Sequence, residues 1–509
     1  MTSSGSSNGS GSIEKTITTL VDWAVSHGAA LHPAIEIYQD ALTGLSFRVK
    51  PSASGDVQPY EPIVQLPTSL TLSYFNAVSE QKAAAPDAFP AEFLARTTPH
   101  VVGRLFLIKE YLKGETSFWY PYIRALPQPG EENRQAWALA PFWPPEEAEL
   151  LEGTNVEVGV EKIRSDVKRD LEEARELLRA TCGEVEGEEK EKGQVEAKAE
   201  AKARRSAFEK ALTTELYQWA YCIFSSRSFR PSLVLSEKQQ SLLPAGVVME
   251  DFSVLLPLFD IGNHDMTTEI RWDLDHHKQQ CELKVGKSHR PGEQVFNNYS
   301  MKTNAELLLG YGFMIPATEE LHNDYTHVRK RTTTAEPPRD SEEYLISLRP
   351  LSHPSSVVAR SKQTLQLDPS TQVLGSFQRV QPEMVWDIIC TLTLPEQRKQ
   401  LVPLTRTTMT EEEEERKNMT AEQYQRHRFL SGRVDGEARM YLEQTVAIIQ
   451  HKVLQELERL DETDVEVVGG DMEELTRNQR LALDYRARCR KVLEGVLEGM
   501  SGDDIFDEE

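Results

Sequence analysis

Three polar clusters, far apart in the sequence, carry side chains that could bind a ligand or assist a reaction. They occupy residues 225–229, 257–265 and 292–313. The first joins serines to an arginine, the second ends an apolar run in Asp-x-x-Asn-His, and the third carries two tyrosines and an Asn-Ala-Glu run. Polar groups at the ends of buried elements commonly hold ligands on a rigid scaffold. If the three clusters converge in the fold, they form one site.

Each cluster also has an ordinary structural explanation when it is taken alone. Arg227 follows the apolar helical segment 216–224, and a basic residue there can simply interact with the last helical carbonyls. The pair Asn263 and His264 is common turn chemistry. The pattern of residues 292–299 predicts a turn that leads into a strand ending at Tyr299, where an aromatic residue more often packs than reacts.

The combination of the three clusters resembles the carboxyl half of a SET domain. The matching features are the Asn-His turn, Gly-Glu followed by Tyr299, and the run Asn-Ala-Glu-Leu-Leu-Leu-Gly-Tyr-Gly-Phe that begins at Asn304. The particular class is that of the Rubisco large-subunit lysine methyltransferase, whose SET domain is split by a helical insertion. Trp23-x-x-x-x-Gly28, residues 110–127 and Arg227-Ser228-Phe229 match in the same order. The resemblance runs from about residue 13 to 316 and is weaker at 480–500.

The resemblance implies S-adenosylmethionine as the cofactor and gives roles to nine residues. Tyr299 matches the catalytic tyrosine, and Asp260 and Tyr311 are expected to line the substrate channel. The expected cofactor-binding residues are Gly44, Leu45, Arg227, Asn263, His264 and Phe313. The family's Gly-x-Gly turn is represented by residues 42–45, in which only the second glycine is present, and Ser300 replaces the glycine after the tyrosine.

These residue types suit methyl transfer to a nitrogen. The reaction is an in-line displacement by a neutral amine, so positioning and exclusion of water provide most of the rate. Aromatic hydroxyls and carbonyl oxygens orient the amine and attract the polarised methyl group without adding a competing nucleophile. A lysine beside a sulfonium in a dry channel has a lowered pKa, because burial and a like charge both disfavour the ammonium form.

Hydrophobic patterning indicates the elements that would position these residues. Period-two runs at 35–38, 45–49 and 63–66 predict strands, whereas helical spacing predicts helices at 13–30, 101–114, 160–180 and 441–460. With 509 residues, about two or three domains are expected. The predicted fold class is α+β, with a β-rich knotted SET core split by a helical insertion and followed by a mainly helical domain. The predicted segments are a flexible tail at 1–12, the SET parts at 13–75 and 251–316, an insertion at 76–250 with a charged disordered or solvated stretch at 183–205, a helical substrate-binding domain at 317–500 and an acidic tail at 501–509.

Composition narrows the classes of partner. The net charge of -24 argues against direct nucleic-acid binding, which requires positive charge to neutralise phosphates. It favours a basic protein as the partner. The most apolar short run, 252–261, falls short of the roughly 20 residues that a membrane helix needs. Five cysteines without a C-x-x-C pair argue against both a disulfide framework and a zinc cluster, and they favour the cytosol or the nucleus.

The leading hypothesis is therefore a protein-lysine N-methyltransferase that acts on a non-histone protein, with a ribosomal or translation protein as the preferred target. No metal is expected. One alternative is a protein-histidine methyltransferase of the same class, because an imidazole could enter a roomier and more polar channel. The other is a SET fold without activity that binds a partner.

Overall fold

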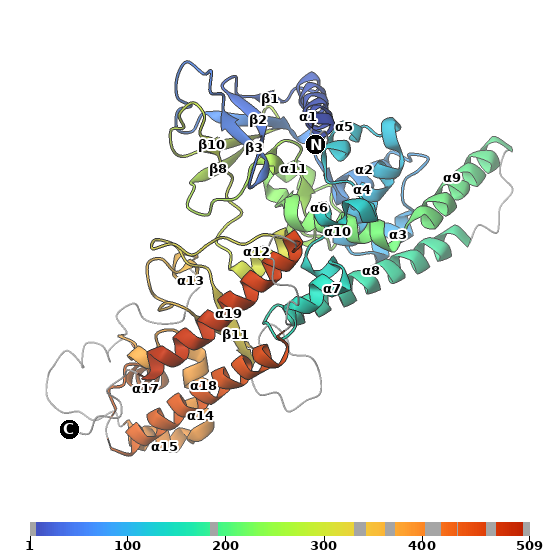
Figure 1. Ribbon diagram of the computed structural model, residues 1–509. Helices are drawn as coiled ribbons and strands as arrows, with labels where there is room; N and C mark the ends of the chain where they lie inside the picture. Colours follow the sequence, from blue (N-terminus) through green and yellow to red (C-terminus); the bar gives the residue numbers. More distant parts are fainter. Residues whose placement is uncertain are drawn as a thin grey trace, which may run out of the picture. The chain divides into compact units, whose positions relative to one another are not determined.

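The computed structural model describes residues 7–183, 192–329, 343–361, 372–402, 419–434, 436–464 and 475–501. The chain divides into two compact units (Figure 1). The first unit combines Met1–Phe142 with Glu161–Ser300, and the second combines Trp143–Val160 with Met301–Glu509. No helix in the described part of the chain is both long and apolar enough to cross a membrane.

Three small antiparallel sheets form the β part of the first unit, within the residues that the structure describes. The first sheet has the order β1 (Ala30–Leu31), β4 (Pro62–Pro67), β9 (Gln280–Val285) and β8 (Ile270–Asp275). The second has the order β10 (Gln294–Val295), β3 (Gly44–Val49) and β2 (Ile35–Asp40). The third has the order β5 (Leu72–Ser73), β7 (Val254–Leu255) and β6 (Ser228–Phe229).

The hairpin of β2 and β3 shows why the sequence forms a strand pair here. Phe47 and Val49 are fully buried and Arg48 between them is more exposed, as expected for a strand with one face in the core. The Asp40 carboxylate accepts hydrogen bonds from the backbone N–H groups of Leu42 and Thr43 and so closes the turn. Gly44 has φ +79°, a conformation that strongly favours glycine.

Helices make up the rest of the first unit. Their bounds are α1 (Ser7–Ser26), α2 (Tyr74–Lys82), α3 (Ala91–Arg96), α4 (Pro99–Leu112), α5 (Tyr120–Ala125), α6 (Arg134–Trp137), α9 (Lys192–Ala211), α10 (Thr214–Arg227) and α11 (Glu237–Gln240). The helix α8 (Glu157–Gly183) begins in the second unit and continues in the first. Short 3-10 helices are η1 (Thr68–Leu70), η2 (Gly114–Thr116), η3 (Glu131–Asn133), η4 (Ala140–Phe142), η6 (Pro231–Leu233), η7 (Met249–Asp251) and η8 (Phe259–Ile261).

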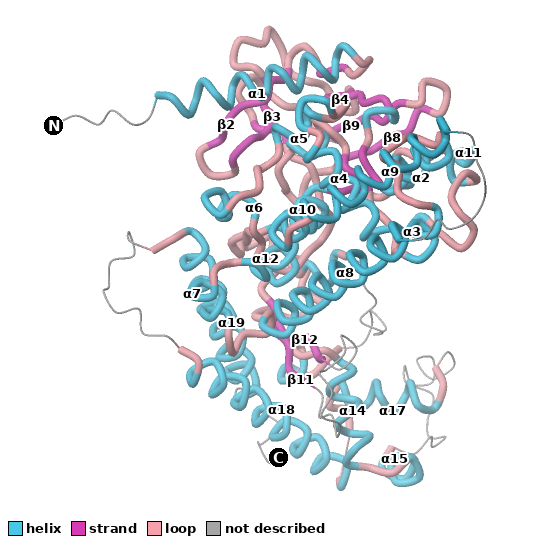
Figure 2. The backbone as a smooth tube through the Cα atoms, turned by 90° about the vertical axis from the view of Figure 1, so that its right-hand side faces the viewer, coloured by secondary structure: helices cyan, strands magenta, loops and turns pink. Residues whose placement is uncertain are grey.

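The helix α10 is important because it ends at Arg227. The Thr213 hydroxyl accepts from the backbone N–H of Leu216 and caps the N-terminus of this helix. Its residues Trp219, Ala220 and Ile223 are buried, and the helix packs against α4 (Figure 2). This packing fixes the end of α10 relative to the strands that follow it.

The second unit is mainly helical. Its elements are α7 (Pro145–Ala148), η5 (Glu149–Leu151), α12 (Asn304–Tyr311), β11 (Tyr325–Arg329), β12 (Glu343–Ser347), α13 (Val357–Arg360), η10 (Gly375–Phe377), α14 (Pro382–Leu392), α15 (Pro395–Leu401), α17 (Ala421–Leu430), α18 (Glu437–Glu462) and α19 (Arg477–Ser501). The predicted apolar face of α18 is buried at Leu442, Val446, Ile449 and Val453. This helix packs along α19 and α14 (Figure 1).

Several elements differ from the sequence-based expectations. The first helix begins at Ser7 instead of residue 13, because extending an existing helix by one residue costs little; residues 1–6 of the expected tail lie outside the described residues. The strand expected to reach Tyr299 ends at Val295. The pair of β11 and β12 was not expected in a helical region, since no short turn joins its two strands.

The predicted domain segments remain predictions where they differ from the two compact units. The charged stretch at 183–205 is partly described, and its residues from Lys192 onward belong to α9. Gly183 ends α8, whereas residues 184–191 of that stretch and residues 502–509 of the acidic tail lie outside the described residues.

Candidate active site

Two segments of the first unit cross at the centre of the candidate site. The backbone N–H of Asn297 donates to the Asn263 carbonyl at 2.7 Å, and the N–H of Asp265 donates to the Asn297 carbonyl at 2.9 Å. Gly262 makes the close approach possible, because a Cβ there would lie 3.0 Å from the Cβ of Asn297. Asn297 is fully buried at this crossing, and no role was expected for it from the sequence. The crossing brings the second and third polar clusters together.

Tyr299 is held by three contacts at this crossing. Its backbone N–H donates to Nδ1 of His264 at 3.0 Å, and its ring stacks on the His264 ring at a centroid distance of 4.9 Å. Its hydroxyl donates to the Gly262 carbonyl at 2.8 Å. Because the hydroxyl proton is engaged, any further hydrogen bond to the phenolic oxygen uses that oxygen as the acceptor. The geometry therefore presents an oriented oxygen acceptor.

His264 acts as a support for Tyr299. Since Nδ1 accepts a hydrogen bond from a backbone N–H, the neutral imidazole carries its proton on Nε2. The nearly parallel rings, 6° apart, fix the plane of the tyrosine.

Asn263 connects the crossing to the turn of the β2 and β3 hairpin. Its side-chain Nδ2 donates to the Leu45 carbonyl at 3.1 Å. Gly44 precedes Leu45, and no atom lies within 4 Å of the position that a Cβ on Gly44 would occupy. Leu42, which stands where the family has its first glycine, is 95 % exposed, so its side chain does not crowd this turn.

Arg227 and Asp260 form a partly buried pair beside the crossing. Nη1 of Arg227 donates to the Asp260 backbone carbonyl at 3.2 Å and lies 3.5 Å from the carboxylate oxygen Oδ2. The Tyr122 hydroxyl donates to the same Oδ2 at 3.0 Å. The Asp260 side chain is 3 % exposed and the Arg227 side chain 31 %. The carboxylate thus faces two protein groups, while about a third of the Arg227 side chain is exposed.

Burial dominates the electrostatics of this group. It raises the pKa of the Asp260 carboxyl, and the Arg227 charge and the Tyr122 hydroxyl oppose that rise. Burial also raises the pKa of Tyr122 well above its usual value, with the Asp260 charge adding to the effect. Tyr122 therefore stays protonated and remains a donor. Tyr122 lies within the segment 110–127 that matches the family, but no role was expected for it from the sequence.

An aromatic cluster adjoins Asp260. The ring of Phe229 lies 6.2 Å from that of Phe259 and 6.3 Å from that of Trp272, each in an edge-on arrangement. Sequence reasoning did not identify this cluster, because its members come from β6, η8 and β8. It provides apolar surface next to the polar groups of the site.

The structure brings seven of the nine expected residues together in the first unit. They are Gly44, Leu45, Arg227, Asp260, Asn263, His264 and Tyr299. Tyr311 and Phe313 belong to the second unit, where α12 ends at Tyr311 and Gly312 takes φ +74°. Their ring centroids are 6.3 Å apart. The roles expected of these two residues stay predictions.

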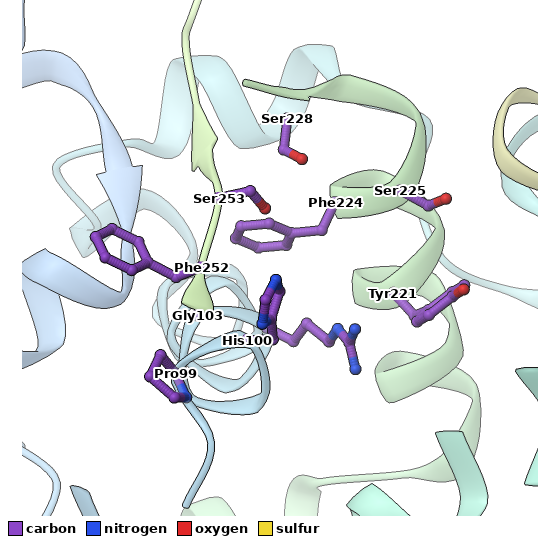
Figure 3. A pocket seen from close by; sticks show the side chains of 10 residues that line it. Pro99, His100, Gly103, Tyr221, Phe224, Ser225, Ser228, Phe252 and Ser253 are labelled. Carbon is purple, nitrogen blue, oxygen red and sulfur yellow. The ribbon is translucent and has the colours of Figure 1, made fainter. Parts of the chain in front are cut away.

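A cavity of about 300 Å³ in the first unit is separate from this group (Figure 3). Its lining includes His100, Tyr221, Phe224, Ser228 and Ser253, and none of the nine expected residues. Successive residues of a strand point to opposite faces, so Ser228 faces the cavity while its neighbour on β6 faces the aromatic cluster. The cavity is therefore lined by residues other than those of the candidate site.

Comparisons with known proteins agree with this picture. No protein-family model matches the chain. The chain is 26 % identical over 302 residues to the ribosomal lysine N-methyltransferase set10 of Schizosaccharomyces pombe, covering 58 % of this chain and 45 % of that protein. It is 26 % identical over 314 residues to the protein-lysine N-methyltransferase EFM1 of Saccharomyces cerevisiae, covering 58 % and 48 %. The chain thus spans about half the length of these curated relatives.

The solved structures establish the fold. A crystal structure of the SET domain of LSMT bound to lysine and AdoHcy matches with a TM-score of 0.58 at 16 % identity, over 96 % of this chain and 92 % of that one. The predicted SET-type fold class and the resemblance to SET-domain lysine methyltransferases are confirmed.

Proposed function

We propose that this chain, a relative of SET-domain lysine methyltransferases that shares their fold, is an S-adenosylmethionine-dependent protein-lysine N-methyltransferase acting on a non-histone protein. The observation that carries the proposal is the position of the Tyr299 hydroxyl. The hydroxyl donates a hydrogen bond to the Gly262 carbonyl, at the crossing where Asn263 and His264 meet the third cluster. The curated relatives carry the same activity in their names.

The residues present fit this cofactor. The guanidinium of the partly exposed Arg227 side chain suits a carboxylate, because its planar fork can donate two parallel hydrogen bonds. The space above Gly44, where a Cβ would meet no atom, permits close approach of a ligand to the backbone. Asn263 and His264 are the further polar residues that would contact the cofactor. When bound, S-adenosylmethionine supplies an electrophilic methyl group on a sulfonium sulfur.

The chain's own residues would then orient the amine. The Tyr299 oxygen accepts a hydrogen bond from an N–H of the substrate amine and keeps its own proton, which it donates in a hydrogen bond to the Gly262 carbonyl. This arrangement directs the nitrogen lone pair along the line of displacement. The aromatic cluster around Phe229 excludes water, and exclusion of water lowers the pKa of the entering lysine so that the neutral amine forms.

The substrate that fits best is a basic segment of a ribosomal or translation protein, encountered in the cytoplasm or the nucleus. The chain has 81 acidic and 57 basic residues, and opposite charge speeds encounter with a lysine-rich partner. The name of the relative set10 points to the ribosome as a target.

Transfer of an isotope-labelled methyl group from the cofactor to a ribosome-rich cell extract tests the proposal. Mass spectrometry of the labelled protein should find methyl-lysine on a ribosomal or translation protein, and excess S-adenosylhomocysteine should suppress it. If the label is found on histidine alone, the acceptor is histidine and not lysine. Cofactor binding without any transfer would identify the chain as a binding module.

A further inference from the structure

Asp260 was expected to line the substrate channel, but its carboxylate has a different environment. The side chain is almost completely buried, and its oxygen Oδ2 is contacted by Tyr122 at 3.0 Å and approached by Arg227 at 3.5 Å. A buried charge is tolerated when it is paired and hydrogen-bonded. The two partners come from different helices, Tyr122 from within α5 and Arg227 from the end of α10, whereas Asp260 belongs to η8.

Arg227 contacts Asp260 twice, both times through the nitrogen Nη1. Nη1 donates to the backbone carbonyl and lies near the carboxylate of the same residue. Because a guanidinium carries five N–H donors in a rigid plane, fixing one nitrogen fixes the direction of the others. About a third of the Arg227 side chain is exposed, at 31 %.

We propose that Tyr122 and Asp260 are positioning residues that aim the Arg227 guanidinium at the carboxylate of the cofactor's amino-acid end. Tyr122 holds the Asp260 carboxylate, Asp260 holds Nη1 of Arg227, and the accessible edge of the guanidinium contacts the ligand. This inference rests on the proposed function, since it requires a cofactor with a carboxylate at this position. It moves Asp260 from the substrate channel to the support of the cofactor site.

Tyr122→Phe isolates the proposed effect. The substitution removes one hydroxyl, keeps the ring volume and changes no formal charge, and Tyr122 is 1 % exposed, so the altered atom is shielded from solvent. Calorimetry should measure two probes: S-adenosylhomocysteine, which has the amino-acid end, and 5′-methylthioadenosine, which lacks it. We expect roughly fivefold weaker binding of the first probe from the lost charge-assisted hydrogen bond, and unchanged binding of the second.

A double-mutant cycle identifies the route of the effect. In an Arg227→Ala background, Tyr122→Phe should cause no further loss of S-adenosylhomocysteine affinity, because its effect passes through the guanidinium. Tyr217→Phe is the matched control, since Tyr217 is another buried tyrosine of the same unit and its hydroxyl contacts Arg104 at 3.3 Å. This control should leave the affinities for both probes unchanged.

The outcomes separate this inference from the proposed function. Equal losses for both probes, or no loss for either, would overturn the positioning role while leaving the cofactor assignment intact. Failure of the wild type to bind either probe would instead overturn the proposed function. If Tyr122→Phe does not fold, Asp260→Asn provides the same comparison, with the same selective loss for S-adenosylhomocysteine expected.

Discussion

The orientation of Tyr299 depends on contacts from a different segment of the chain. Its N–H and its ring contact His264, and its hydroxyl contacts Gly262. Three contacts from one rigid turn restrict the rotation of the side chain before any ligand binds. Such preorganisation is the main way in which enzymes orient reacting groups at low cost.

Ser300, directly after Tyr299, is in a conformation that favours glycine. Its φ is +73°, although it carries a side chain. We expect Ser300→Gly to raise the free energy of unfolding of the first unit by about 0.5 to 1 kcal/mol, because relief of the left-handed strain exceeds the entropy that glycine adds to the unfolded chain. Chemical denaturation of both proteins measures this difference.

Ser300→Ala is the control for that experiment. It removes the hydroxyl, which bonds to the Tyr299 carbonyl, but keeps the Cβ and hence the strain. The alanine variant should be no more stable than the wild type. If it gains as much stability as the glycine variant, the strain explanation is wrong.

At the scale of elements, sequence patterning located the strands β2, β3 and β4 and the helices α1, α4 and α8. The hairpin of β2 and β3 was recognisable because alternating burial and turn residues occur within one short segment. The strand pair β11 and β12 was missed, since its two strands are joined by a long connection. The Thr303 and Glu306 capping box of α12 is a pattern that can be recognised in a sequence, because both partners lie within one helical turn.

The candidate site was predictable in its residue types but not in its contacts. The bond from Asn263 to Leu45 joins residues 218 positions apart, and the pair of Tyr122 and Asp260 is 138 apart. Local patterns say nothing about which distant segments meet. For Tyr122, an aromatic residue in a helical motif gave no sign that its hydroxyl has a carboxylate partner.

Residues 184–204, which include the first part of α9, should be dispensable for catalysis. Arg179 of α8 forms an ion pair with Glu209 of α9, and Phe208 packs on Phe89, so the part of α9 that follows residue 204 has structural contacts. By contrast, Lys202 and Arg204 are exposed. Replacement of residues 184–204 by a short Gly/Ser linker should leave cofactor affinity unchanged in calorimetry. A large loss of affinity would show that this segment supports the site.

At the scale of the whole molecule, the charge of -24 should act on the protein substrate and not on the cofactor. Raising the salt concentration from about 0.05 to 0.5 M shortens the Debye length from above 10 Å to about 4 Å and screens long-range attraction. We expect KM for a basic protein substrate to rise severalfold, with kcat nearly constant. A KM that is independent of salt would exclude electrostatic attraction as the basis of substrate choice.

The most direct test of the proposed activity is single-turnover methyl transfer to lysine by the wild type and by Tyr299→Phe, with calorimetric cofactor binding in parallel. The substitution removes one oxygen and almost no volume. If the Tyr299 oxygen orients the amine, the rate should fall at least roughly tenfold, about 1.4 kcal/mol of barrier, while cofactor affinity is nearly preserved. Equal rates for the two proteins would contradict the role of Tyr299 and with it the proposed site.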